Sequence, residues 1–232
     1  MERLARVEEI LDGPLDDLEA VAGNLRDLRR VNRLLGGTRL SRLAITRLWP
    51  DGTSLSVLDV GTGGADIPVS LLADAARHGR SLRVEAIDSR PEVIEAARLA
   101  RPALDRVAGL SLQVADGLAL PYPDGAFDVA HASMVVHHLA PDEVVAFLHE
   151  LRRVARAGIV VNDLVRGQLA WLGGWLLVRA LGAGRYARHD GPLSVRRAYS
   201  RPELLELVAA AGLVPIATFG GVAGHRIAVA AR

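Results

Sequence analysis

Two adjacent histidines, His137 and His138, stand where the apolar run Met134–Val136 ends. A histidine side chain exchanges protons near neutral pH and binds metal ions, so the pair is suited to acid–base chemistry or to a metal site. Asp163 ends a later apolar run, GIVVNDL, and could orient an imidazole or accept a proton itself. The chain has no cysteine, which excludes thiol catalysis, zinc–thiolate sites and disulfides. These three residues are therefore the candidates for catalysis.

A glycine-rich segment, VLDVGTGGADIP, follows the first strand-like run of the chain. Gly61 and Gly63 would let the backbone approach a ligand closely, and the helix that follows offers free N–H groups. A dinucleotide-binding fingerprint needs a third glycine at position 66, where Asp66 would repel a pyrophosphate. No Walker-type Gly-Lys-Ser/Thr occurs, because the chain has no lysine. The segment predicts a ligand that is not bound through phosphates.

Alternating strand-like and helical segments surround these residues. Short β-branched runs end in Gly, Ser, Asp or Asn, and helices are expected between them, with capping boxes at residues 89–92 and 200–203. The last two strand-like runs, joined by a Gly-rich turn, predict a closing hairpin. The predicted fold is α/β: a Rossmann-like, doubly wound, seven-stranded sheet with a C-terminal antiparallel hairpin strand and an N-terminal helical cap.

The same pattern divides the chain into two predicted units. Residues 15–48 have helical periodicity, interrupted at Gly36-Gly37. We predict an N-terminal helical cap or lid over residues 1–50 and an α/β domain over residues 51–232. Within the domain, residues 165–199 have an apolar first half and no clear period afterwards, which predicts a lid insert.

Composition limits the partners. A length of 232 residues with 50% hydrophobic residues predicts one well-packed domain without long disorder. The formal charge of +1 argues against nucleic-acid binding through bulk positive charge. The most apolar segment, residues 169–178, is too short to span a bilayer, and the N-terminus lacks the apolar region of a signal peptide. We expect a cytoplasmic protein with no membrane span, and the sequence is compatible with a homodimer.

Asp59, Gly61 and Gly63 match the acidic-x-Gly-x-Gly loop of class I S-adenosylmethionine-dependent methyltransferases, which the chain resembles from about residue 55 to its end. Ala65 replaces the third glycine of that family. The resemblance implies S-adenosylmethionine (SAM) as the cofactor, with Asp88 at the ribose hydroxyls and Asp116 near the adenine amino group. The implied cofactor contacts are Asp59, Gly61, Thr62, Gly63, Asp88, Ser89, Asp116, Gly117, Leu118 and Ser133.

The histidine pair resembles that of bacterial small-molecule O-methyltransferases. This branch includes enzymes of the ubiquinone/menaquinone type and enzymes that act on natural-product sugars. This resemblance implies that His137, His138 and Asp163 lie near the transferred methyl group, with His137 as a base or an acceptor contact. His138 alternatively packs the loop beside the donor. The three residues could also ligate a metal ion, but the resemblance requires none and we expect none.

The insert supplies the expected acceptor contacts, Trp171, Trp175, His189, Arg197 and Tyr199. The two tryptophans alternatively serve only helix packing. The predicted function is methylation of a hydroxyl on a small, hydrophobic or aromatic metabolite in bacterial secondary metabolism. Two alternatives stay open: carbon or nitrogen methylation of a small molecule, and a methyltransferase-fold protein that binds SAM without methyl transfer, as a cyclase or regulatory partner.

Overall fold

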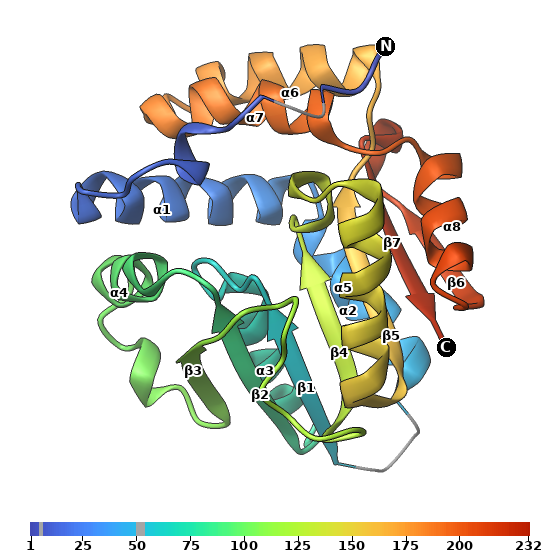
Figure 1. Ribbon diagram of the computed structural model, residues 1–232. Coiled ribbons are helices and arrows are strands. Elements are labelled where there is room, and N and C mark those ends of the chain that lie inside the picture. The colour runs from blue at the N-terminus through green and yellow to red at the C-terminus, as the bar shows by residue number, and fades with distance from the viewer. Residues whose placement is uncertain (5–6, 50–53) are drawn as a thin grey trace.

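A seven-stranded sheet with helices on both faces forms the centre of the molecule (Figure 1). The computed structural model describes residues 1–4, 7–49 and 54–232. The strand order is β3-β2-β1-β4-β5-β7-β6, and β7 runs in the opposite direction to the other six strands. The predicted sheet and closing hairpin are confirmed. The strands are β1 (Leu55–Val60), β2 (Leu82–Asp88), β3 (Leu110–Val114), β4 (Phe127–Ser133), β5 (Ala155–Leu164), β6 (Pro215–Gly220) and β7 (Arg226–Ala231).

The helices alternate with the strands and also extend beyond the sheet. None of them, in the described parts of the chain, is long and apolar enough to cross a membrane. The α-helices are α1 (Leu18–Leu34), α2 (Gly37–Leu48), α3 (Asp66–Arg77), α4 (Pro91–Ala100), α5 (Pro141–Val154), α6 (Gln168–Ala180), α7 (Arg185–Arg197) and α8 (Arg201–Ala210). Short 3-10 turns are η1 (Ile10–Asp12), η2 (Leu104–Arg106), η3 (Val136–His138) and η4 (Val222–Gly224).

Alternate residues of the central strands pack into two cores. Val57 and Val129 lie in the core under α2 and α3, whereas Leu58 and Ala130 lie in the core under α5 and α8. Successive side chains of a strand point to opposite faces, so a near-continuous apolar run is needed for a sheet covered on both sides. Because β1, β2, β4 and β5 pair in parallel, their carboxyl ends meet at one edge of the sheet, over which α1 lies (Figure 1).

The insert after β5 is helical throughout most of its length. It forms α6 and α7, and α7 lies against η1 and η3, so it covers the loop that carries the two histidines. The second helix has Pro192 in its interior. A proline there removes a backbone hydrogen bond, which is one reason the sequence shows no plain helical signal.

Both expected helices are present, but one of the two expected capping boxes is absent. Helix α4 begins at Pro91 with Arg90 as N-cap and no side-chain cap, so Ser89 does not form a capping box. The reason is that Asp88, at the end of β2, accepts the N–H of Arg90 at 3.2 Å. The capping box of Ser200 and Glu203 is present at the start of α8.

The predicted boundary between cap and domain, at residues 50–51, lies outside the described residues. On the described side, α2 packs on β5 and β7 within the helical layer, whereas α1 packs on α4 beyond the sheet edge. The division into a cap and a domain stays a prediction.

Candidate active site

The glycine loop after β1 makes a sharp turn at the sheet edge. Gly61 and Gly63 have φ of 69° and 52°, and a side chain at Gly61 would collide with the side chain of Val135 in the loop after β4. Ala65 also has a positive φ, 50°, a conformation that costs an alanine about 1 kcal/mol. The hydroxyl of Thr62 is buried and has no hydrogen-bond partner in the described part of the chain. The loop thus offers an unused polar group to a ligand.

Asp88 joins the end of β2 to this loop. Its Oδ2 accepts the N–H of Gly63 at 3.1 Å and its Oδ1 accepts that of Arg90 at 3.2 Å. Burial raises the pKa of Asp88, although these two hydrogen bonds act in the opposite direction. A carboxylate has about four acceptor positions, so Asp88 can still accept hydrogen bonds from a diol. Ser89 beside it is exposed.

Asp116 and its neighbours form the corresponding turn after β3. Asp116 is exposed, and its Oδ1 accepts the N–H of Leu118 at 2.9 Å. A side chain at Gly117 would lie 2.8 Å from Val60 and 3.1 Å from Phe147, so glycine lets this turn lie close against β1 and α5. Leu118 is exposed and offers an apolar surface next to Asp116.

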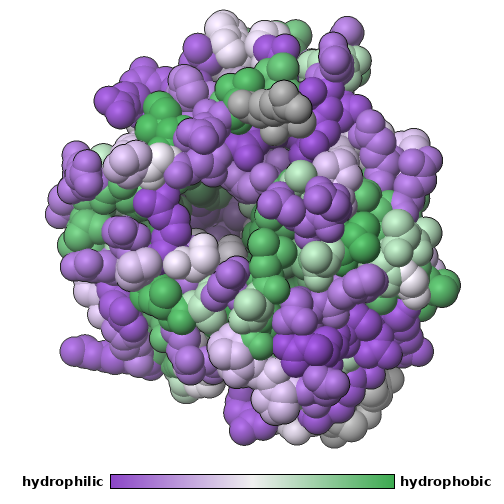
Figure 2. Space-filling view, in the orientation of Figure 1, coloured by the Kyte–Doolittle hydropathy of each residue, from purple (hydrophilic) through white to green (hydrophobic). Residues whose placement is uncertain are grey.

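The molecular surface has a hollow near these turns. Figure 2 shows the hollow, and in the same orientation Figure 1 places it between α1, α4 and the carboxyl ends of the central strands. The glycine loop, Asp88 and Asp116 follow three of those strand ends. Because β1, β2 and β3 pair in parallel, the structure brings the glycine loop, Asp88 and Asp116 to the same edge of the sheet.

Two predicted cofactor residues, Asp59 and Ser133, make contacts within a buried polar network. Asp59 is hydrogen-bonded to Nδ1 of His131, and Nε2 of that ring lies 2.8 Å from the hydroxyl of Ser41. Arg226 donates to the hydroxyl of Ser133 at 2.9 Å. These contacts hold neighbouring strands and α2 together. A contact of Asp59 or Ser133 with the cofactor stays a prediction.

His137 and Asp163 form a buried pair. Oδ1 of Asp163 lies 2.7 Å from Nδ1 of His137, and Oδ2 accepts the backbone N–H of His137 at 3.1 Å. Because a carboxylate only accepts, Nδ1 carries the proton and Nε2 of the neutral ring presents a lone pair. Burial opposes the ionisation of Asp163, but the adjacent imidazole and its hydrogen bond hold the pKa of this carboxyl below its usual value.

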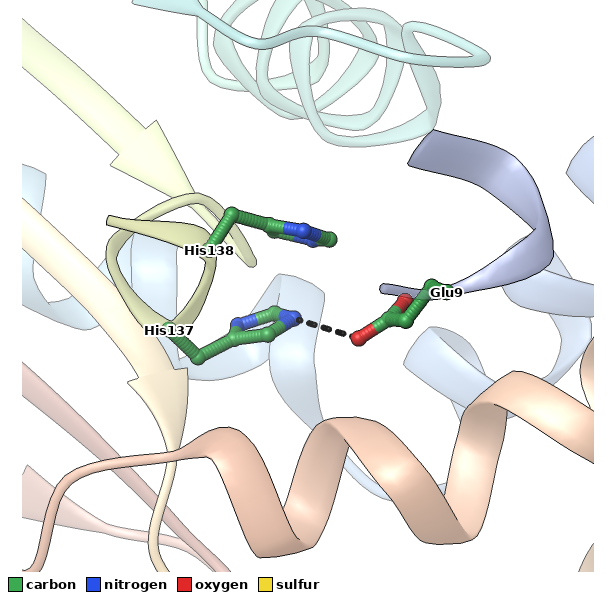
Figure 3. A group of neighbouring side chains, drawn as sticks. All are labelled: Glu9, His137 and His138. Carbon is green, nitrogen blue, oxygen red and sulfur yellow. Dashed lines mark ion pairs between the residues drawn. The ribbon is translucent and has the colours of Figure 1, made fainter. Parts of the chain in front are cut away.

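Glu9 is a site residue that sequence reasoning missed. Its Oε1 lies 3.8 Å from Nε2 of His137, an atom that is buried without a hydrogen bond among the described residues (Figure 3). The hydroxyl of Ser194 donates to the same carboxylate at 2.8 Å. Burial raises the pKa of Glu9 to about 6. A proton near Nε2 can therefore also reside on Glu9 close to neutral pH.

His138 contacts Asp12 and Arg197, and Arg197 also pairs with Glu9 at 3.7 Å. Its Nδ1 lies 3.1 Å from Oδ1 of Asp12, and Arg197 forms an ion pair with the same carboxylate. Arg197 also donates to the backbone carbonyl of His138 at 3.2 Å. Burial raises the pKa of Asp12, but the hydrogen bonds from His138, the backbone of Glu9 and Arg197 hold it well below its usual range. In this structure the predicted acceptor contact Arg197 holds the N-terminal segment.

The two histidines and Glu9 lie close enough to be considered as metal ligands. Their ligand atoms are within 4.8 Å of one another. The imidazole rings are stacked, with centroids 4.2 Å apart and planes at 37°, and Figure 3 shows them extending side by side. Ring-nitrogen lone pairs lie in the ring planes, so one ion would need a rotated ring to reach both. Asp163 is engaged with His137, and the expectation of a metal-free site stays a prediction.

A segment that we call the N-terminal strap, residues 7–17, brings Glu9 and Asp12 to the histidines. Asp190 of α7 accepts the N–H groups of the strap residues Ile10 and Leu11 at 2.9 and 3.2 Å. Arg90, at the cofactor side, donates to two strap carbonyls, both at 2.8 Å. The strap thus links α7 to the rim of the hollow, and it passes between α7 and α1 (Figure 1).

The remaining predicted acceptor residues lie farther from the histidine pair. The hydroxyl of Tyr199 donates to a backbone carbonyl just after the histidines, at 2.8 Å. Trp171 and Trp175 are half-buried on α6, and His189 is largely exposed on α7. Within the described ranges, no hydrogen bond or ion pair joins Trp171, Trp175 or His189 to His137. Their contact with an acceptor stays a prediction.

Comparisons with known proteins agree with this geometry. Residues 57–158 match the family model described as a methyltransferase domain. The chain is 32% identical over 190 residues to the demethylmenaquinone methyltransferase of Thermus thermophilus. The aligned region covers 73% of this chain and 80% of that protein. It is 30% identical over 131 residues to the ubiquinone/menaquinone biosynthesis C-methyltransferase UbiE of a Geobacter species, over 55% of this chain and 53% of the relative. The chain thus spans about half the length of such curated relatives.

The fold is similar to that of a solved SAM-dependent methyltransferase from Aquifex aeolicus. The TM-score is 0.63 at 21% identity, over 90% of this chain and 97% of the other. The chain belongs to the class I SAM-dependent methyltransferase family, as its glycine loop predicts. SAM is the cofactor that this membership assigns. The glycine loop, the hydroxyl of Thr62, which has no hydrogen-bond partner among the described residues, and the partly buried carboxylate of Asp88 fit a ligand with polar groups of this kind.

Proposed function

We propose that the chain methylates a hydroxylated, hydrophobic or aromatic small molecule. The observation that carries this proposal is the buried pair of Asp163 and His137, whose Nε2 has no hydrogen-bond partner among the described residues. His137 stands two residues after Val135, which packs against Gly61 of the glycine loop. A proton acceptor is thus positioned next to the loop that belongs to the methyl donor in this family.

The residues of the chain have a limited task in such a reaction. When bound, SAM supplies an electrophilic methyl group and leaves as S-adenosylhomocysteine, so alignment contributes more than activation of the donor. A hydroxyl nucleophile loses its proton, and Nε2 of His137 accepts it. Asp163 holds the ring in the required tautomer and stabilises the imidazolium that results. Glu9 can share the same proton from the other side.

A carbon atom of the same kind of acceptor is a second candidate, because several relatives are named as ubiquinone/menaquinone biosynthesis C-methyltransferases. Removal of the proton from a phenolic hydroxyl increases the electron density on the neighbouring ring carbons. One base at His137 therefore serves methylation of the oxygen or of the adjacent carbon. The Asp163–His137 pair supports both outcomes, and oxygen is our first candidate.

Incubation of the full chain with isotopically labelled SAM and a panel of phenols, quinols and hydroxylated metabolites tests the proposal. Mass spectrometry detects transfer, and NMR of the product distinguishes an O-methyl group from a ring methyl group. Transfer only to amines would contradict both candidates. If the chain binds S-adenosylhomocysteine but transfers no methyl group to any acceptor, the reading as a binding protein without transfer is favoured.

A further inference from the structure

Helix α6 exposes an apolar stripe. Leu169, Leu172 and Leu176 are 79%, 47% and 53% exposed and are spaced to lie on one side of the helix. Val222 in η4, which α6 contacts, is 77% exposed. The opposite side of α6 packs on α7 through Val178. We call the three leucines and Val222 the α6 patch, and nothing among the described residues covers it.

Positive charge is concentrated around this patch. Residues 165–199 contain six arginines and a single acid, which is a formal charge of +5 in a chain whose total is +1. The acid, Asp190, is buried and bound to the strap. Every exposed residue of α7 is basic: Arg185, Arg188, His189 and Arg196. The insert therefore presents apolar and basic side chains without an exposed acid.

Four of the six arginines have no ion pair within the described ranges. Arg166 pairs with Glu203, and Arg197 pairs with the strap. The four others include three that, with His189, line an open surface pocket of about 620 Å³ at the junction of α6 and α7: Arg179, Arg185 and Arg188. Such a pocket is suited to an anionic head group.

We propose that α6 and α7 dock on the surface of an anionic phospholipid bilayer. The α6 patch enters the interfacial region, and the arginines around it contact lipid phosphates, which is the pattern of interfacial helices. The half-buried tryptophans of α6 are residues that favour this interface. A membrane also supplies hydrophobic molecules from the side on which α7 covers the histidine loop.

Charge argues for this partner over two others. In a symmetric dimer through the α6 patch, the same unpaired arginines of both copies would face one another, and like charges disfavour that contact. The arginines would bind the phosphates of a nucleic acid, but the exposed leucines would then lie against its polar backbone. An anionic bilayer satisfies both kinds of side chain.

Sedimentation of the full chain with vesicles tests the proposal without donor or acceptor, so it does not depend on methyl transfer. We expect binding to phosphatidylcholine vesicles that contain a quarter phosphatidylglycerol to be at least about tenfold stronger than to pure phosphatidylcholine, and to weaken with salt, since each arginine near an anionic surface contributes about fivefold. Binding to neither vesicle, or equal binding to both in low salt, would overturn the proposal.

Variants separate the two parts of the surface. Combined Leu169→Ser, Leu172→Ser and Leu176→Ser should reduce anionic-vesicle binding by about tenfold or more, because these side chains leave water on binding. Combined Arg179→Gln, Arg185→Gln and Arg188→Gln should reduce it and flatten its salt dependence. Leu99→Ser and Val214→Ser, at exposed positions on α4 and before β6, are matched controls and should bind normally.

Two further measurements distinguish other occupants. Circular dichroism and binding of S-adenosylhomocysteine check that the variants are folded. Light scattering in the absence of lipid should give one oligomeric state for the unmodified chain and the leucine variant. A dimer that the leucine variant loses would overturn the proposal in favour of a second copy. Binding of inorganic phosphate that the arginine variant loses, without vesicle binding, would overturn it in favour of a free anion.

Discussion

The contact between His137 and Asp163 is the residue-scale feature on which methyl transfer should depend. We expect His137→Ala and Asp163→Asn each to lower turnover by about ten- to a hundredfold, at or below the low end of general-base effects because the methyl group is already activated. Steady-state kinetics with the acceptor identified by screening measures this. The double variant should lose less than the product of the single losses, since both residues act on one proton.

A matched control for this prediction is His149→Ala, because His149 is exposed on α5 and lies outside the site. Affinity for S-adenosylhomocysteine should be unchanged in all of these variants. The pH profile of the unmodified chain should have an acidic limb that His137→Ala flattens. Full activity of both single variants from pH 6 to pH 9 would leave the pair as a wall of the pocket.

Asp88 is the residue through which the cofactor assignment can be tested separately. Asp88→Asn keeps the shape but removes the charge, and we expect a loss of about 1.5–3 kcal/mol in the binding of S-adenosylhomocysteine, as for hydrogen bonds to a charged group. Isothermal titration calorimetry measures it. Asp105→Asn, at an exposed ion pair on the surface, is the control. Equal affinity of the Asp88 variant and the unmodified chain would contradict the ribose assignment.

The raised pKa of Glu9 predicts a pH-dependent stability. Burial raises the pKa of Glu9 from 4.5 to about 6, so the folded state holds the proton more strongly than the unfolded state. This stabilisation is complete below about pH 4.5 and is lost as the pH rises through about 6. The side chain of Glu9→Gln does not titrate, so the variant does not lose this stabilisation. The free energy of unfolding of the variant, relative to that of the unmodified chain, should therefore rise by about 1 kcal/mol from pH 5 to pH 7.5. Urea unfolding at the two pH values measures this, and a constant difference would contradict it.

At the scale of elements, the strap and the insert differ from the sheet in how they are held. The strap is held by polar contacts to α7 and to Arg90 and by a smaller apolar cluster that includes Leu15, whereas the central strands are buried in two larger apolar cores. Segments with few apolar contacts open at lower free energy. We therefore expect faster hydrogen exchange in residues 7–17 and 168–197 than in β1, β4 and β5.

Ligands should change that difference. Because Arg90 stands beside Asp88 and also holds the strap, binding of S-adenosylhomocysteine should slow exchange in residues 7–17 more than in β6 and β7, which lie away from the hollow. Hydrogen exchange followed by mass spectrometry measures both comparisons. Equal, high protection of the strap with and without the ligand would mean that the strap is part of the core and not a lid.

At the scale of the whole molecule, Arg226 connects the closing hairpin to the site. Its side chain is fully buried and donates to Asn162 at 2.8 Å, to Asn32 at 2.7 Å and to Ser133 at 2.9 Å. It therefore joins β7 to β5, α1 and β4. Burial lowers the pKa of Arg226, and the carboxylate of Asp163 acts in the opposite direction.

Removal of this arginine should destabilise the entire chain. We expect Arg226→Leu to reduce the free energy of unfolding by about 3–5 kcal/mol, because it leaves buried polar groups and carboxylates without their cation. Arg232→Leu, one residue beyond the same strand and exposed, should have little effect. Urea unfolding of both variants measures the difference. Equal stability of the two variants would show that the network contributes no net stability.

The sequence by itself determined the sheet, the closing hairpin and the cofactor loop. These are local features: the alternation seen at Val57 and Leu58 follows from strand geometry, and Gly61 and Gly63 are needed where the backbone has a positive φ. Asp163 ends a strand, and the carboxyl ends of parallel strands meet at one edge. Its position near His137 was therefore predictable from topology.

Only the tertiary structure decided which groups surround the histidines. Glu9 lies in a charged N-terminal stretch without a recognisable motif, and Asp190 and Ser194, which contact the strap, lie in a segment far from it in the chain. Their contacts depend on how the strap crosses α7, which no local pattern encodes. The sequence also predicted Arg197 as an acceptor contact, whereas the fold pairs it with Asp12. A hydrogen bond between distant segments is set by the path of the chain, and that path is a property of the packed molecule.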